Sequence, residues 1–125
     1  MHSLRSDTDT NTLHMTFSGK VTAANLERLE RSAVVAARVL DSEFVLVTDI
    51  SDCTGVTCSA IERIDSVVDQ LGQFGLARAV RVVGDTTPTA VKRQFDSSDD
   101  RRDIEVEVLE SADELSPERT TKATS

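Results

Sequence analysis

Apolar and polar residues alternate along this chain with two different periods, which separates the expected strands from the expected helices. Residues 2–6 and 13–18 flank a polar run of turn-forming residues, and this arrangement predicts a β-hairpin. Every second residue of the later segment is apolar, so His14 is expected on the more polar face of its strand. Gly19 and Lys20 are expected to end that strand.

Two longer segments show the helical period. After Thr22, whose hydroxyl can cap a helix, residues 23–40 carry apolar side chains at intervals of three and four. The apolar positions of residues 59–72 repeat in the same way, and Ser59 precedes Glu62 with the spacing of a capping box. We therefore expect two amphipathic helices, each with one face on the core.

Three further segments predict strands, one of which leads into a third helix. The near-continuous apolar run 44–50 is typical of a central strand covered on both faces. Residues 78–84 form the next strand, after which Thr87 and Pro88 predict a helix start with Thr87 as the cap. The strict alternation of residues 104–109 predicts a half-buried edge strand.

These elements follow one another in the order β-β-α-β-α-β-α-β. Strands that alternate with helices imply an α/β fold with a largely parallel sheet and right-handed crossovers, and the opening hairpin makes that sheet mixed. The length of 125 residues suits a single domain, expected at residues 1–118, with an exposed connector at 97–103 and a last helical turn near the end. Residues 119–125 are expected to form a disordered tail.

The chain is acidic, with a formal net charge of -8, which argues against nucleic-acid binding through a basic surface. Asp outnumbers Glu, Arg greatly outnumbers Lys, and aromatic residues are scarce, a composition expected of a halophilic source. The N-terminus lacks the apolar segment of a signal peptide, and no stretch is long enough to cross a bilayer. A cytoplasmic protein without membrane insertion is therefore expected.

The patterns of chemically reactive residues do not indicate an enzyme. Neither the two cysteines nor the two histidines have the spacing of a metal site or a CxxC motif. Glycine-rich phosphate loops are absent, and no nucleophile, base and acid converge in the sequence. No catalytic activity, metal or cofactor is expected.

The segment 48–64, which joins the apolar strand to the second helix, gathers the candidate functional residues. Ser59 is expected to be the helix N-cap, although Thr57 fits the same role. Either hydroxyl could carry a phosphate, because the free N–H groups of a helix N-terminus favour an anion. Thr54, which precedes a glycine, is expected in a turn.

The same segment contains both cysteines and an aspartate at the predicted end of the strand. Cys53 and Cys58 are expected to be small buried thiols, and the alternative for Cys58 is a reactive thiol activated by the helix N-terminus. Asp49 lies where α/β folds place ligands. Receiver domains carry their phosphorylated carboxylate at a similar position, at the end of a strand. Such a domain would also need an acidic pair after the first strand, which is missing, and a lysine after a late strand, for which Lys92 is in the wrong place.

The order of elements, with an opening hairpin and a helix after the sequence FVLVTDIS, resembles the STAS domain and the related SpoIIAA-like family over residues 4–115. STAS is the fold of anti-sigma factor antagonists. In its phosphorylatable members, a strand-end aspartate is followed by Asp-Ser-Ser/Thr-Gly at a helix start, and the first serine receives the phosphate.

By this resemblance, Asp49 matches the strand-end aspartate, and the motif falls on Thr57, Cys58, Ser59 and Ala60. Cys58 therefore stands where the phosphoserine is expected. SpoIIAA-like proteins commonly lack that serine, so the chain resembles them more closely.

The resemblance implies a non-catalytic regulatory module that binds a protein partner, kinase-like or otherwise, through Thr54–Ile61. Phosphate on Thr57 or Ser59 would gate the binding. The alternative is binding of a small apolar ligand or lipid, since the SpoIIAA-like fold resembles lipid-carrying CRAL-TRIO domains, and this would need apolar volume beyond the core. A homodimer is also left open.

Overall fold

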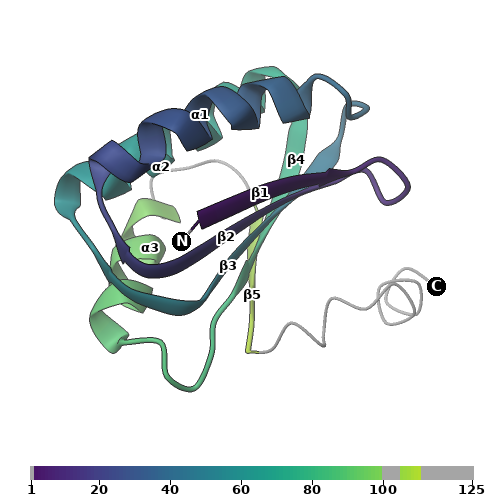
Figure 1. Ribbon diagram of the computed structural model, residues 1–125. Coiled ribbons are helices and arrows are strands. Elements are labelled where there is room, and N and C mark those ends of the chain that lie inside the picture. Colours follow the sequence, from purple (N-terminus) through teal and green to yellow (C-terminus); the bar gives the residue numbers. More distant parts are fainter. Residues whose placement is uncertain (1, 100–104, 111–125) are drawn as a thin grey trace.

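The computed structural model describes residues 2–99 and 105–110, and the elements in this part follow the predicted order (Figure 1). The strands are β1 (His2–Asp7), β2 (Thr12–Val21), β3 (Phe44–Val56), β4 (Leu76–Val82) and β5 (Glu105–Leu109). The helices are α1 (Ala23–Ala37), α2 (Cys58–Gln73) and α3 (Thr89–Asp99).

The C-terminal predictions are tested only in part. α3 extends into the predicted connector at 97–103, because polar residues on an exposed helix resemble a loop in sequence. The rest of that connector, the predicted last helical turn and the predicted tail at 119–125 lie outside the described residues.

The strands form one mixed sheet in the order β1-β2-β3-β4-β5. β1 pairs antiparallel with β2, and each later pair of neighbours is parallel. This confirms the predicted α/β fold with a mixed, largely parallel sheet. It also places β5 at an edge of the sheet, as the alternation of its residues predicts.

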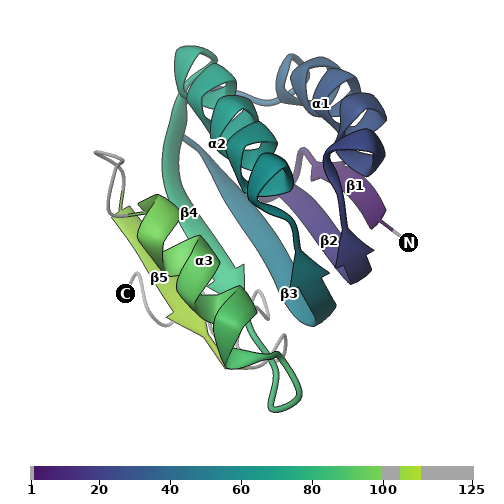
Figure 2. The same cartoon turned by 90° about the vertical axis from the view of Figure 1, so that its left-hand side faces the viewer.

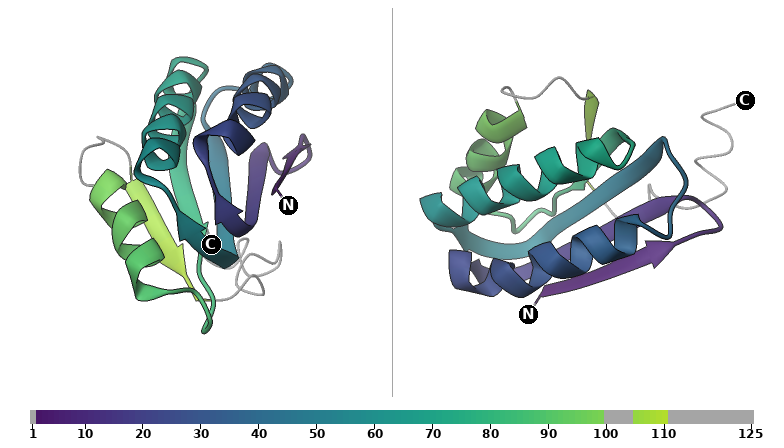
Figure 3. Two further views of the ribbon diagram at one scale, coloured as in Figure 1. Left: turned by 60° about the vertical axis from the view of Figure 1, so that its left-hand side comes forward. Right: turned by 90° about the horizontal axis from the view of Figure 1, so that it is seen from above.

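All three described helices lie on one face of the sheet (Figures 2 and 3). Each parallel crossover moves one strand further in the same direction, so right-handed crossovers place every helix on the same side. The prediction that the strand at 44–50 is covered on both faces by other elements is therefore wrong for the described helices. We call the opposite side of the sheet the helix-free face. Its apolar centre is formed by neighbouring strands packing side by side: Val45, Val47, Val80, Val82 and Leu109.

The main core lies between the helices and the sheet. The apolar side chains of β2 point into it, as their alternation predicts, and Leu13 and Phe17 are fully buried. They meet buried residues from α1 and α2, including Leu26 and Ile64. Replacing a buried leucine such as Leu26 with alanine would remove roughly 2–5 kcal/mol of stability.

β2 and β3 both continue past their predicted ends. Gly19 has a φ of 71° where the register between β2 and β3 shifts at a bulge in β3, and β2 runs on to Val21. β3 follows it to Val56. The predicted end of β2 at Gly19 is wrong, and so is the prediction that the strand at 44–50 stops before the polar residues that follow it. Residues 51–55 look like a loop in sequence, but their backbone pairs with β2.

The ends of α1 show one confirmed and one corrected prediction. Thr22 caps the helix: its hydroxyl accepts a hydrogen bond from the backbone N–H of Asn25 at 3.4 Å, and the Asn25 side chain accepts one from the backbone N–H of Thr22 at 3.1 Å. The helix ends at Ala37 rather than at Leu40, because residues 38–40 make tighter hydrogen bonds to the carbonyl three residues earlier.

His14 lies on the helix-free face, opposite Arg5 of β1, as the alternation predicts. Partial burial lowers the pKa of His14 from its ordinary value of 6.5, and Arg5 lowers it further, while Asp7 acts weakly in the opposite direction. The unfolded chain then binds a proton more readily than the folded one. Stability should therefore fall as the pH drops from 6.5 toward the lower pKa of the folded state.

A His14→Gln variant should lose this component of the pH dependence. Urea midpoints of both proteins, measured between about pH 7 and pH 5, would show a steeper decline in the wild type. Parallel curves for the two proteins would contradict the assignment.

Candidate functional site

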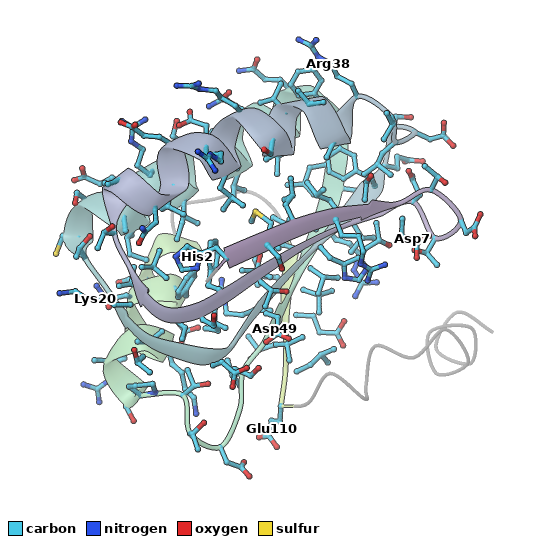
Figure 4. The ribbon with its side chains drawn as sticks, in the orientation of Figure 1. His2, Asp7, Lys20, Arg38, Asp49 and Glu110 are labelled. Atoms are coloured by element: carbon cyan, nitrogen blue, oxygen red, sulfur yellow. The ribbon has the colours of Figure 1, made fainter. Side chains whose placement is uncertain are left out.

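The candidate site begins where β3 separates from β4. Pairing between these strands ends at Asp49, opposite Val82. The sequence predicts Asp49 at the end of its strand, but it lies within β3. Its side chain projects on the helix-free face (Figure 4). One oxygen of its carboxylate accepts hydrogen bonds from the backbone N–H of Ser51 at 2.9 Å and from the Ser51 hydroxyl at 2.6 Å. The carboxylate therefore stabilises the irregular stretch of β3 where its register with β2 shifts.

Thr54 stands at a second irregularity near the end of β3. The register between β2 and β3 shifts at this residue, so Thr54 has no direct partner in β2. Its side chain is exposed, whereas its neighbour Cys53 is buried. Thr54 is therefore part of a bulged strand rather than the predicted turn, and the bulge directs its side chain outward.

Thr57, rather than Ser59, caps α2. The Thr57 hydroxyl accepts a hydrogen bond from the backbone N–H of Ala60 at 3.1 Å, and its backbone N–H donates to the carbonyl of Val21 at 3.1 Å. The preferred prediction of Ser59 as the cap is wrong, and the alternative is confirmed. β2 fixes the chain at Thr57, so the helix begins immediately after it. Ser59 lies in the first turn, exposed, with its hydroxyl 3.3 Å from that of Thr57.

Replacing the Thr57 cap should weaken α2 measurably. Thr57→Ala is expected to lower the free energy of unfolding by about 1 kcal/mol, because the N–H of Ala60 loses its acceptor. Ser59→Ala is the matched control and should change it by less than about half of that. Chemical denaturation of the two variants decides the point, and a larger loss from Ser59→Ala would reverse the assignment of the cap.

The two cysteines differ in exposure. Cys53 is buried, as predicted, and its thiol lies 3.6 Å from the carbonyl oxygen of Gly55. Burial raises the pKa of the Cys53 thiol, which makes it less reactive. Cys58 is exposed, so the prediction of a buried thiol is wrong there. As the first residue of α2, it lies outside the apolar stripe of the helix.

Thr87 links the middle of β3 to the segment that follows β4. Its buried hydroxyl accepts a hydrogen bond from the backbone N–H of Gly84 at 2.9 Å and lies 3.3 Å and 3.2 Å from the carbonyl oxygens of Ile50 and Ser51. The prediction that Thr87 caps α3 is therefore wrong, and α3 begins at Thr89. The Thr87 side chain is buried, so its hydroxyl bonds with Gly84 and β3 instead of with the first turn of α3.

The exposed part of the site is narrower than the predicted segment. We call Thr54, Thr57, Cys58 and Ser59 the docking edge; their side chains are exposed, except for that of Thr57, which is half-buried. Ile61 is buried and anchors α2. Sequence reasoning missed Gln94 of α3, whose side-chain amide donates to the carbonyl of Val56 at 2.9 Å. A glutamine on an amphipathic helix gave no signal of this contact.

The described residues offer no metal centre. Within residues 2–99 and 105–110, no cluster of three or more His, Cys, Asp or Glu side chains could hold a metal ion. None of the helices in these segments combines the length and apolar character needed to cross a bilayer.

Comparison with known proteins places the fold. No protein-family model matches the sequence, and no curated protein matches it. Among solved structures, the anti-sigma factor antagonist SpoIIAA in its unphosphorylated form superposes with a TM-score of 0.64 at 14% identity, over 97% of this chain and 98% of that one. The chain has the SpoIIAA-like fold. This confirms the resemblance drawn from the sequence at the level of the fold.

Two further solved structures show the same fold. The phosphorylated form of SpoIIAA, described as a Bacillus cell fate determinant, has a TM-score of 0.60 at 12% identity over the whole of both chains. An uncharacterised DUF3478-family protein with a SpoIIAA-like fold from Shewanella loihica PV-4 also has a TM-score of 0.60, at 14% identity, over 91% of this chain and 88% of that one.

The cavities of this SpoIIAA-like domain bear on the lipid-binding alternative. Between the helices and the sheet, the cavity beside Arg81 and Phe95 has a volume of about 20 Å³, enough for about one water molecule. A larger groove of about 540 Å³ lies between α1 and α2 and is open to solvent. It is lined by Glu27, Glu30, Arg31, Val34, Arg63 and Gln70. Neither of these two cavities has the enclosed apolar volume that a lipid needs.

Proposed function

We propose that this chain is a non-catalytic, STAS-like regulatory module that binds a protein partner, kinase-like or another regulator, through Thr54–Ile61. The observation that carries the proposal is the docking edge itself, where small polar side chains and a thiol are exposed at the start of α2. Support also comes from the fold, since two solved structures that share it are those of an anti-sigma factor antagonist.

Hydrogen bonds to α3 and β2 fix the backbone at the docking edge, which suits a binding surface. Gln94 fixes the end of β3 through the carbonyl of Val56, and the backbone N–H of Thr57 donates to the carbonyl of Val21 in β2. A surface that is ordered before binding loses less conformational entropy when a partner arrives. The proposed mechanism is therefore complementarity between a preformed edge and the partner.

A phosphate on the docking edge would provide the gate. The hydroxyl of Thr57 is occupied as the cap of α2, whereas the side chains of Ser59 and Thr54 are exposed. A phosphate on Ser59 would add a charge close to -2 beside the N-terminus of α2, where the helix dipole favours it. Such a charge would create or remove a docking surface.

Peptide-mapped mass spectrometry of the protein isolated from its own cells tests this gate. Phosphate on Ser59, Thr54 or Thr57 would support a switch on a hydroxyl next to Cys58. Unmodified peptides under every growth condition would rule out the phosphate gate. The remaining proposal would then be a module that binds its partner constitutively.

A further inference from the structure

The outer surfaces of α1 and α2 form a second feature, separate from the docking edge. The two helices lie side by side and parallel on the same face of the sheet, since both connect parallel strands (Figure 2). Glu30 of α1 joins them, with its carboxylate 3.1 Å from the guanidinium of Arg63 and 2.7 Å from the side-chain amide of Gln70. These contacts place Glu30 level with the middle of α2.

The outer face of α1 is basic and partly apolar. Its exposed residues recur at intervals of three and four, on the side of the helix opposite its buried residues, and continue just beyond its end. They are Arg28, Arg31, Val35, Arg38 and Val39. Val35 and Val39 are 63% and 59% exposed, and Arg38 points away from the sheet (Figure 4). In the part of the chain that the structure describes, these three arginines form no ion pair.

The outer face of α2 has the opposite charge. Its exposed residues follow the same spacing and are Glu62, Ser66, Asp69 and Gln73. Glu62 and Asp69 make no ion pair with any other described residue. Phe74, directly after the helix, is 37% exposed. A basic surface and an acidic surface of similar length thus lie next to each other on one chain.

We infer that a second copy of this chain covers these helices, with α1 of each copy on α2 of the other. Two copies can face each other about a two-fold axis parallel to the helices or perpendicular to them. The perpendicular axis would set α1 against α1, and basic against basic, at a cost in repulsion. The parallel axis sets each basic face on an acidic one and closes the dimer through two identical contacts.

The register along the helices agrees with this arrangement. A two-fold axis parallel to the helices keeps every residue at its own level. Counting from Glu30, Arg31 lies within one turn of Asp69, and Phe74 falls between Val35 and Val39. The charged groups therefore meet near the middle of the interface, and the exposed apolar residues meet at one end.

A charge exchange tests the dimer independently of the docking edge. The wild type should be dimeric in analytical ultracentrifugation at low ionic strength. Arg31→Glu alone and Asp69→Arg alone should each weaken the dimer by roughly tenfold or more, because both symmetric contacts become repulsive. Arg93→Glu, an exposed substitution on α3, should leave it unchanged.

Recovery of the dimer distinguishes pairing from misfolding. An equimolar mixture of the Arg31→Glu and Asp69→Arg proteins should form a heterodimer, since each contact again joins opposite charges. The double variant should dimerise by itself. A wild type that stays monomeric would overturn the inference. Binding of an acidic peptide or of anionic vesicles to the α1 face of such a monomer would show a different occupant. Folded single variants that are not restored by mixing would overturn the inference as well.

Discussion

Thr54→Arg should weaken binding of the regulatory partner by roughly 30- to 1,000-fold, equivalent to about 2–4 kcal/mol. Thr54 is exposed at a bulge of β3 and lies in the docking edge. An arginine there adds a long charged side chain to a surface otherwise made of small groups. The partner then cannot approach the start of α2 without displacing that side chain or burying its charge.

Thr8→Arg is the matched control for this experiment. Thr8 is an exposed residue in the turn between β1 and β2, at the opposite end of β2 from the docking edge. Wild type and both variants would be immobilised, exposed to an extract of the source cells, and compared for the partner retained on each. Equal losses for Thr54→Arg and Thr8→Arg would show that charge alone, and not position, governs binding.

Thr87→Val should lower the free energy of unfolding by about 1–3 kcal/mol, although valine has nearly the same shape as threonine. The change removes the acceptor of the Gly84 N–H and the donor to the carbonyls of Ile50 and Ser51, which join β3 to the segment after β4. The loss arises because these backbone groups keep their cost of burial but lose their hydrogen-bond partner.

Two substitutions define what the hydroxyl of Thr87 does. Thr87→Ser keeps the hydroxyl and should recover most of the stability, while Thr89→Val makes the same chemical change at an exposed position and should alter it little. Urea denaturation of the three variants gives the comparison. A Thr87→Val protein as stable as the Thr89→Val protein would show that the hydroxyl does not hold the strands together.

The order of elements could be predicted because hydrophobic period and capping residues act locally. Thr22 lies directly before an amphipathic segment, and the structure confirms it as a cap. The placement of all helices on one face could not be predicted from the apolar run at 44–50. That run reports burial on both faces of a strand, and neighbouring valines provide such burial as well as a helix does.

The candidate site was harder to predict because tertiary pairing decides its geometry. The polar residues 51–55 favour a loop by composition, yet β2 extends beside them and makes them a strand. That extension fixes the chain at Thr57. The cap of α2 is therefore Thr57 and not the later residue Ser59, and Cys58 is left exposed. None of these outcomes follows from local propensity, since each depends on a strand distant in sequence.

Cross-linking from Cys58 would test the docking proposal most directly. Cys58 is exposed and Cys53 is 1% exposed, so a thiol-reactive photocross-linker should attach selectively at the docking edge of the native protein. The control carries Cys58→Ser together with Thr8→Cys, which moves the label to the far end of β2. In extract from the source cells, we expect one protein to be cross-linked from position 58 and not from position 8. Cross-links of that protein from position 8 alone, or equally from both positions, would contradict it.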